Sequence, residues 1–204
     1  MEETAFPLRA ADAGAAEAEL VAKARAGNLF AFEEIVRRHE RRVYAVAFRI
    51  VRRHDVADDV VQEAFLRAYR SLDRFDTARP FGPWIARIAA NLAVSHVRSP
   101  VAREEELPEG YGEVAARSPG PLEGVLHAEA QQVLDKAVEA LSAEQRAVFV
   151  LRANEELSYR EIAEALDLSI GTVMSRLSRA RERLRTALLP YLGGAAQRRQ
   201  GGEA

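Results

Sequence analysis

The segment LSYREIAEALDLSIGTVMSRLSRARERLR, Leu157–Arg185, decides the fold of the C-terminal half of the chain. Ser158 followed three residues later by Glu161 is the signature of a capping box, and it predicts a short helix from Tyr159 to Leu166. A second, longer helix is predicted from Ile170 to about Leu189. Two helices joined by so short a turn indicate a helix-turn-helix.

The turn of this motif is unusual in one respect. Asp167 stands where glycine is commonest, but Asp tolerates a left-handed backbone better than most residues. Ser169 is the predicted N-cap of the second helix, and Pro190 is predicted to end it. The small core of the motif is predicted to consist of Ile162, Ala163, Leu166, Leu168, Val173 and Leu177.

The outward face of the second helix carries hydroxyl and guanidinium groups. Such a helix can place its first residues against base edges in a major groove and its later arginines against phosphates. The alternative, which spacing alone leaves open, is a surface helix with a solvated arginine face. The outward residues are Thr172, Ser175, Arg176 and Arg179, followed by Arg181, Arg183 and Arg185.

The charge is unevenly distributed along the 204 residues, although the total is only −2. Residues 20–98 carry fifteen bases and nine acids, whereas residues 99–124 carry six acids, two bases, four Pro and four Gly. The second stretch cannot continue a helix or strand far, so it is predicted to be a flexible acidic linker. The predicted divisions are a disordered tail 1–19, a domain 20–98, the linker 99–124, a domain 125–190 and a tail 191–204.

The first domain is also predicted to be helical, which makes the fold class all-α with two small helical domains. Apolar residues recur at three- and four-residue steps between Phe32 and Val51. Asp55 is the predicted N-cap of the next helix. A breaker-rich loop over residues 72–83 precedes a helix from Trp84 to Val97. In the second domain, helices are predicted over Val125–Leu141 and, after the capping box at Ser142, to about Ala153.

Three aromatic residues, Phe75, Phe81 and Trp84, lie among arginines in and after this loop. Rings stack on unpaired bases and guanidinium groups hold the backbone, so the cluster favours single-stranded nucleic acid. The alternative is that the rings fill the core, which applies in part to Trp84. Phe75 and Phe81 are expected to be exposed.

Asp59, Gln62 and Glu63 share one helical face, which is either solvated or a protein-docking patch. The chain contains no Cys, and its four His residues lack metal-ligand spacing and a nucleophile partner. No catalytic residue, metal or cofactor is therefore predicted. The N-terminus lacks the pattern of a signal peptide and no apolar run could span a membrane, which predicts a cytoplasmic protein.

Four segments together resemble the bacterial RNA polymerase sigma factors of the extracytoplasmic-function (ECF) class. They are AFEEIVRRHERRVYAVAFRIV, DVADDVVQEAFLRAYRSLDRF, RPFGPWIARIAANLAVSHVR and LSYREIAEALDLSIGTVMSRLSRARERLR. The resemblance implies a transcription initiation factor, not an enzyme, whose two domains read the −10 and −35 promoter elements. It also implies three partners, namely core RNA polymerase (its β′ clamp helices and β flap), promoter DNA and an anti-sigma factor.

The resemblance assigns site residues in three groups. Those implied to dock on core polymerase are Asp55, Asp59, Gln62, Glu63 and Arg70. Those implied at the single-stranded −10 element are Phe75, Arg79, Phe81, Trp84, Arg87, Asn91 and Arg98. Those implied at the −35 element are Ser158, Tyr159, Arg160, Ser169, Thr172, Ser175, Arg176, Arg179 and Arg183.

A stand-alone helix-turn-helix regulator that binds duplex DNA without polymerase is the competing function class. It has no need of an aromatic–arginine melting loop or a docking face in the first domain. A purely structural adaptor would leave both basic faces unexplained. The 26-residue linker can extend to roughly 85–95 Å, more than the roughly 70 Å between promoter elements two helical turns apart.

Overall fold

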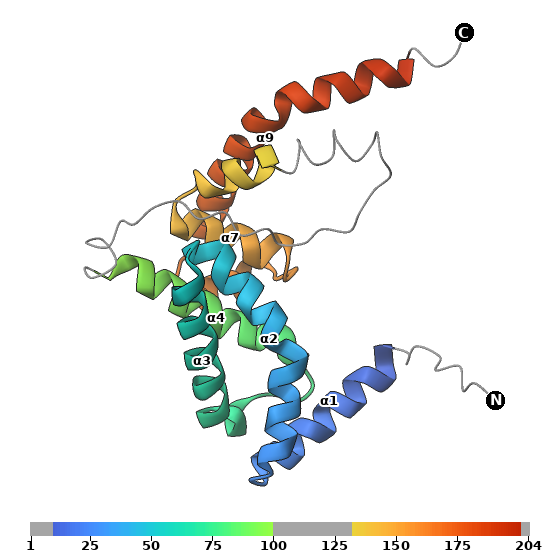
Figure 1. Ribbon diagram of the computed structural model, residues 1–204, viewed down its shortest axis with the longest axis vertical. Coiled ribbons are helices and arrows are strands. Elements are labelled where there is room, and N and C mark those ends of the chain that lie inside the picture. The colour runs from blue at the N-terminus through green and yellow to red at the C-terminus, as the bar shows by residue number, and fades with distance from the viewer. Residues whose placement is uncertain (1–9, 100–131, 201–204) are drawn as a thin grey trace, which may run out of the picture. The chain divides into compact units, whose positions relative to one another are not determined.

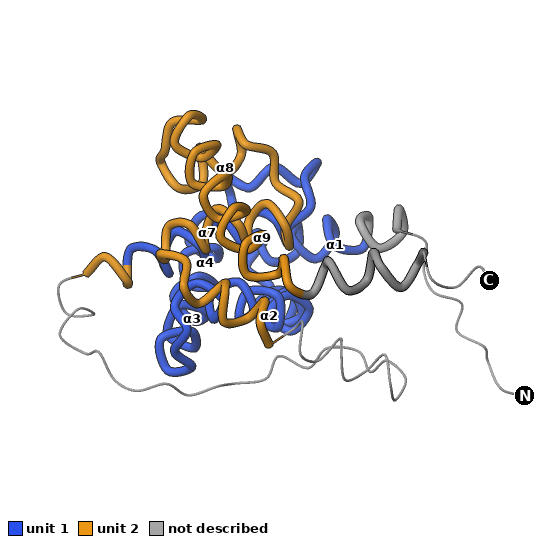
Figure 2. Tube along the Cα trace, turned by 90° about the horizontal axis from the view of Figure 1, so that it is seen from above, with its two compact units in different colours: residues 1–95 blue, residues 96–204 orange. Residues whose placement is uncertain are grey.

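The computed structural model describes residues 10–99 and 132–200, and all regular elements in these ranges are helices (Figure 1). The chain divides into two compact units, Met1–Ser95 and His96–Ala204 (Figure 2). The predicted all-α class with two helical domains is confirmed. The acidic segment 99–124 lies outside the described residues except for Ser99.

Over residues 10–95, the first unit is built from three α-helices, a 3-10 turn and most of a further α-helix, α4. They are α1 (Ala10–Arg25), α2 (Leu29–Val51), α3 (His54–Arg70), η1 (Leu72–Arg74) and α4 (Phe81–Arg98). Asn28 caps α2, because its side-chain oxygen accepts from the backbone N–H of Ala31 at 3.1 Å. At the other end of α2, Arg52 adopts a left-handed conformation with φ 60° and turns the chain toward α3.

The core of the first unit lies where α2 meets α1, α3 and α4. Large buried side chains such as Ile35, Phe48 and Ile85 come from the apolar faces of their helices. One face of α4 is built from small residues, and they are fully buried. These residues are Ala86, Ala89, Ala90 and Ala93.

Three helix starts differ from the sequence-based expectation. Helix α1 begins at Ala10, so the prediction of a disordered tail through residue 19 is wrong for residues 10–19. Helix α3 begins at His54, so Asp55 lies in the first turn and is not the N-cap. The Asp55 carboxylate forms an ion pair with the Arg53 guanidinium at 2.6 Å. Helix α4 begins at Phe81, three residues earlier than expected.

The second unit contains a helix over residues 132–139 followed by α7 (Ala143–Ala153), α8 (Tyr159–Leu166) and α9 (Ile170–Gln200). Both predicted capping boxes are confirmed. The Ser158 hydroxyl accepts from the N–H of Glu161 at 3.2 Å, and the Glu161 carboxylate accepts from the N–H of Ser158 at 2.9 Å. Residues 125–131 of the helix expected over Val125–Leu141 lie outside the described residues.

The helix-turn-helix has the predicted turn. Asp167 is left-handed, with φ 52°, and its N–H bonds the carbonyl of Ala163. The N–H of Leu168 reaches the same carbonyl at 2.9 Å, which closes α8 in the manner of a glycine-terminated helix. The predicted core residues are buried, except that Leu168 is half-buried.

Helix α9 does not end where the sequence suggests. It continues through Pro190 to Gln200, so the predicted stop at Pro190 is wrong. A proline removes one i→i−4 hydrogen bond and crowds one carbonyl, and a long helix can absorb both by bending. Within the described ranges, no helix has the length and apolar character needed to cross a membrane.

Candidate nucleic-acid and protein interfaces

The residues predicted to read duplex DNA form a stripe on α9. At about 100° per residue, Thr172, Ser175, Arg176, Arg179 and Arg183 fall on one side of the helix, beside its buried stripe. The buried stripe consists of Val173, Leu177, Ala180 and Leu184. The helix-turn-helix core therefore fixes the direction in which the polar stripe faces.

The hydroxyl groups at the start of this stripe serve the helix itself. Ser169 Oγ accepts from the N–H of Thr172 at 3.1 Å, which confirms Ser169 as the N-cap, and it lies 2.8 Å from Thr172 Oγ1. Ser175 Oγ donates to the carbonyl of Thr172 at 3.0 Å. Arg176 and Arg179 form no ion pair within residues 10–99 and 132–200, so their charges are available to an outside anion.

Arg183, at the far end of the stripe, has a structural contact. Its Nη1 donates to the carbonyl of Ala140 at 2.8 Å, just beyond the helix over residues 132–139. A cation at that position satisfies a carbonyl that the helix leaves unpaired. The sequence did not indicate this contact, because the two residues are 43 positions apart.

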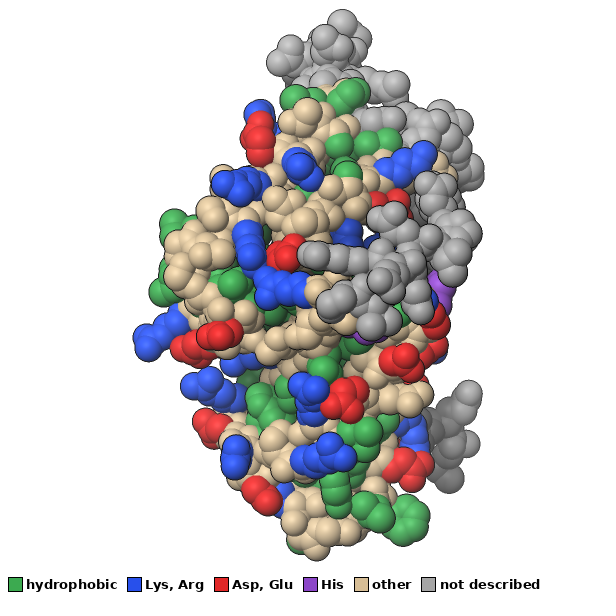
Figure 3. Space-filling view, turned by 90° about the vertical axis from the view of Figure 1, so that its left-hand side faces the viewer, with side chains coloured by type: hydrophobic (Ala, Val, Ile, Leu, Met, Phe, Trp, Pro, Cys, Tyr) green, Lys and Arg blue, Asp and Glu red, His purple; other side chains and the backbone are tan. Residues whose placement is uncertain are grey.

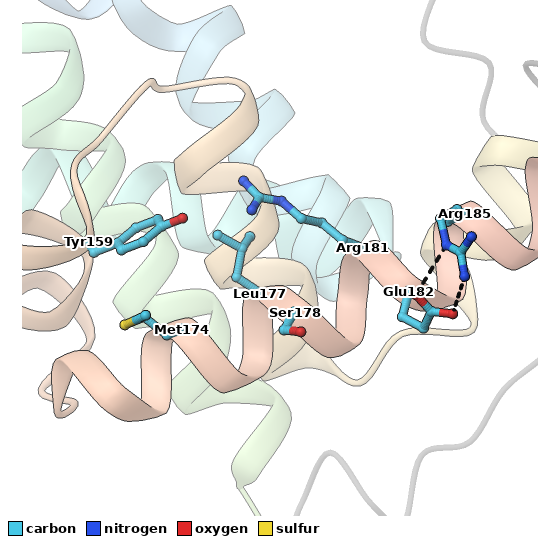
Figure 4. A pocket seen from close by; sticks show the side chains of 7 residues that line it. All are labelled: Tyr159, Met174, Leu177, Ser178, Arg181, Glu182 and Arg185. Carbon is cyan, nitrogen blue, oxygen red and sulfur yellow. Dashed lines mark hydrogen bonds and ion pairs between the residues drawn. The ribbon is translucent and has the colours of Figure 1, made fainter.

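The other predicted −35 residues lie on or beside α8. Arg160 pairs with Glu164 at 3.3 Å and is highly exposed. Tyr159 lines a pocket of about 330 Å³ with Met174, Leu177 and Arg181 (Figure 4). At about 100° per residue, this flank of α9 is opposite to the side that carries Arg176. Arg185 pairs with Glu182 at 2.8 Å on the same flank. Arginines 181 and 185 thus face away from the stripe.

Two of the three rings in the aromatic cluster of the first unit are buried, which makes the expectation of exposed Phe75 and Phe81 wrong. Phe75 is 5% exposed and Phe81 is 0% exposed. Their ring centroids lie 5.4 Å apart, and Trp84 lies 4.8 Å from Phe75 and 5.3 Å from Phe81. His39 of α2 packs on Phe81 at 5.2 Å. Fully buried rings cannot stack on bases, so these two phenylalanines organise the core under the loop.

The exposed part of this loop is residues 76–80, which we call the 76–80 loop. Asp76 Oδ1 accepts from the N–H of Ala78 at 3.0 Å, an Asx turn that gives the loop a defined shape. Arg79 is exposed and lies 3.7 Å from the Asp76 carboxylate. Of the predicted −10 residues, Arg79, Asn91 and Arg98 are exposed, whereas Trp84 and Arg87 are half-buried.

Asn91 lies in a basic pocket of about 440 Å³. The pocket is lined by Arg67, Arg70, Ser71, Arg74, Ile88 and Asn91, from the end of α3, η1 and α4. Arg70, which the resemblance implies at the polymerase interface, therefore lines the same pocket as Asn91, which the resemblance implies at the −10 element. Sequence reasoning placed Arg74 among the arginines near the aromatic residues but missed Arg67, although its spacing of three residues from Arg70 is a signal for one helical face.

The predicted docking face of α3 is partly paired. Glu63 binds Arg67 at 2.7 Å, and the hydrogen bond from Arg53 holds the pKa of Asp55 below its ordinary value. Asp59 and Gln62 are exposed. Leu66, at 51% exposed, and Tyr69 continue the same stripe at three- and four-residue steps, so the face combines acidic and apolar groups.

Two further apolar residues, Leu29 and Phe30, are exposed at the start of α2, Phe30 to 83%. On the face drawn in Figure 3, basic and acidic side chains are interspersed, with hydrophobic ones showing between them. No group of three or more His, Asp or Glu among the described residues could hold a metal ion.

The fold and these surfaces define the class as an all-helical protein in two units, one of which carries a helix-turn-helix. The family model for sigma-70 region 2 matches residues 35–102, and the model for sigma-70 region 4 matches residues 131–184. The first match covers the loop and the basic pocket, and the second covers the helix-turn-helix.

Individual relatives narrow the class. The chain is 34% identical to the ECF RNA polymerase sigma factor SigW of Bacillus subtilis (strain 168), over 79% of this chain and 91% of that protein. It is 34% identical to the ECF RNA polymerase sigma-E factor of Escherichia coli (strain K12), over 85% of this chain and 94% of that protein. The chain belongs to the ECF RNA polymerase sigma factors.

Two solved structures show the same architecture. One is CnrH in complex with the cytosolic domain of CnrY, with a TM-score of 0.55, 32% identity and coverage of 86% of this chain and 97% of that one. The other is the sigma factor RpoE in complex with the anti-sigma factor NepR from Bartonella quintana. Its TM-score is 0.56 at 29% identity, and the match covers 77% of this chain and 96% of that one.

Proposed function

We propose that this chain binds core RNA polymerase, directs it to promoters through −35 and −10 elements and promotes DNA opening. The observation that carries this proposal is the pairing of two different nucleic-acid surfaces. A helix-turn-helix suited to a major groove lies in one unit, and a basic pocket and an exposed loop lie in the other. Duplex recognition and single-strand capture are the two steps that promoter opening requires.

At the −35 element, the stripe on α9 is the reading surface. Arg176 and Arg179 carry the positive charge, and the first turn of α9 brings backbone N–H groups and hydroxyls toward the groove. Arg183 contributes less to DNA binding in this proposal, because its guanidinium is engaged by the Ala140 carbonyl.

At the −10 element, the pocket around Asn91 receives an unpaired base. The Asn91 amide both donates and accepts, which suits a base edge, and Arg70 and Arg74 can hold the flanking phosphates. The 76–80 loop, with Arg79, lies exposed for the same strand. Phe75 and Phe81 have no direct part in this step because both are buried.

Core polymerase is proposed to dock on the face of α3 that presents Asp59, Gln62, Leu66 and Tyr69. The β′ clamp helices are the partner of this face, and the β flap is the partner of the second unit. Exposed leucine and tyrosine in a polar rim are typical of a protein interface. This face distinguishes the proposal from a stand-alone regulator, which has no use for it.

Regulation by an anti-sigma factor is part of the same proposal. The relatives CnrH and RpoE were each solved with a second protein, which in the case of RpoE is named as an anti-sigma factor. As a transcription initiation factor the chain leaves the phosphodiester chemistry to the polymerase, and it acts in the cytoplasm, where the chromosome is transcribed.

The decisive experiment is transcription in vitro with core polymerase on a library of promoter fragments, with start sites read out. We expect start sites that share −35 and −10 elements. Arg176→Ala should weaken the −35 contribution by ~1–3 kcal/mol if the contact is to a base. Arg185→Ala is the matched control, since this arginine lies on the same helix but on the opposite flank, paired with Glu182. Equal effects of the two variants, or no transcription with wild type, would contradict the proposal.

A further inference from the structure

Helix α1 holds one end of the 76–80 loop through its last residue. Arg25 Nε donates to the carbonyl of Leu72 at 2.8 Å, and Arg25 Nη2 donates to the carbonyl of Phe75. Both carbonyls belong to the segment that leads into the loop. A guanidinium presents its donors in a rigid fork, so one side chain fixes two points of this backbone.

The same helix holds the other end of the loop through Glu17, about two turns earlier. Glu17 Oε2 accepts from the backbone N–H of Phe81 at 3.0 Å, and Glu17 Oε1 accepts from His39 Nε2 at 2.7 Å. Phe81 is the first residue of α4, whose own first turn contains no acidic residue. Glu17 therefore supplies, from 64 residues away, the acceptor that a helix N-terminus lacks.

Between these two clamps the loop itself is exposed. Residues 76–80 are exposed, whereas Phe75 and Phe81 on either side are buried. The rings anchor the two ends in the core, and α1 fixes the backbone beside each ring. A loop whose ends are already fixed loses less conformational entropy when it binds a strand.

We propose that Glu17 and Arg25 are positioning residues that pre-arrange the 76–80 loop for capture of the single strand. The inference rests on the proposed function, because the step it affects is promoter opening. Neither residue touches DNA in this proposal, and both act through the backbone of the loop. Helix α1 therefore has a role in positioning the 76–80 loop, which the sequence did not predict.

The test uses the full chain, alone and with core polymerase. In the chain alone, the amides of residues 76–79 and of Phe81 should exchange at least about tenfold faster in Arg25→Ala and Glu17→Ala than in wild type. A tenfold change corresponds to a loss of ~1.4 kcal/mol of local stabilisation. With core polymerase, promoter opening measured by permanganate reactivity should fall by a similar factor. Binding to core polymerase and to a −35 duplex should not change.

Matched controls come from the same helix. Lys23 and Glu19 form an exposed pair at 2.8 Å, so Lys23→Ala and Glu19→Ala remove the same types of charge without touching the loop. Glu17→Gln should restore most of the opening, because its amide oxygen still accepts from Phe81. If Arg25→Ala does not fold, Arg25→Lys keeps the charge but loses the fork and should still loosen the loop.

Unchanged loop exchange in the two variants would overturn the inference. So would faster exchange with unchanged opening, because the loop would then need no positioning. Failure of the proposed function is seen separately, as a wild-type chain that opens no promoter. In that case the exchange of residues 76–81 still decides whether α1 clamps the loop.

Discussion

Phe81 lies at the centre of the first unit's aromatic cluster, packed between Phe75, Trp84 and His39. Its neighbours in sequence are breakers, Pro80, Gly82 and Pro83, which is why an exposed position was expected. Burial follows from α1 and α2, which cover the start of α4. At the scale of single residues, the role of a ring depends on helices that lie far away in the sequence.

Replacement of Phe81 by Ala should lower the free energy of unfolding by about 3–5 kcal/mol, because the variant leaves a cavity in a fully buried site. Urea denaturation followed by circular dichroism measures this change. Arg79→Ala is the control, since Arg79 is exposed in the adjacent loop and its removal should change stability by less than about 0.5 kcal/mol. Lost promoter opening with unchanged stability would indicate instead that Phe81 contacts DNA.

The Glu17 carboxylate makes the stability of the chain depend on pH. The hydrogen bond from His39 lowers its pKa below the ordinary value of 4.5, partial burial opposes this effect, and the N–H of Phe81 adds to it. A lowered folded-state pKa means that the carboxylate stabilises the fold above pH 4.5, and that this contribution is lost as the pH falls from 4.5 through the folded-state value.

Glu17→Gln should therefore be less stable than wild type by about 1 kcal/mol at pH 7, the difference between charged and neutral hydrogen bonds. The gap should narrow as the pH drops below 4.5. Urea titrations of both proteins between pH 3 and pH 7 provide the measurement. A gap of constant size across this range would show that the charge of Glu17 does not stabilise the fold.

At the scale of elements, the helix-turn-helix follows closely from its local sequence. The two capping boxes, the Ser169 cap and the left-handed Asp167 were all predicted from residues no more than four positions apart, and all are confirmed. Helix α9 is the exception, because it continues beyond Pro190. The loss of a single hydrogen bond did not outweigh the rest of the helix.

Asp167 offers a test of this turn. Its φ of 52° is a left-handed conformation, which destabilises any residue with a Cβ atom. Asp167→Gly should therefore raise the free energy of unfolding of the second unit. The gain is limited to about 1 kcal/mol, because glycine also has more conformational freedom in the unfolded chain. Asp167→Val should lower it by about 1–2 kcal/mol, since a β-branched side chain resists this conformation. Asp167→Asn should be near neutral. Denaturation curves in which valine is tolerated as well as glycine would exclude a strained turn.

At the scale of the whole molecule, the near-zero net charge conceals surfaces with different partners. The −2 total combines a basic first domain, an arginine stripe on α9 and acidic segments at 1–19 and 99–124. Non-specific DNA binding depends on phosphate neutralisation, so we expect a near-neutral chain to bind random DNA weakly. Under the proposed function, promoter recognition then depends on core polymerase, which brings both proposed reading surfaces to one promoter.

The proposed docking face of α3 allows the dependence on core polymerase to be tested. Changing Asp59 and Glu63 together to Lys should reduce affinity for core polymerase by at least tenfold (~1.4 kcal/mol), because two acidic groups at the interface are reversed. Fluorescence anisotropy of the labelled chain with core polymerase measures the effect. Asp73→Lys, in the exposed η1 turn, is the charge-matched control for a single reversal. Normal binding by the double variant would remove α3 from the docking surface.

The sequence by itself determined the all-α class, the division into two helical parts, the capping boxes and the helix-turn-helix, because each depends on residues close together in the chain. Tertiary structure decided which side chains of those helices are available. It buried Phe75 and Phe81, placed Arg70 beside Asn91, engaged Arg183 with Ala140 and fixed the loop through Glu17 and Arg25. Local periodicity specifies a helix and its apolar face, whereas contacts between residues 43 to 64 positions apart exist only once the helices have packed.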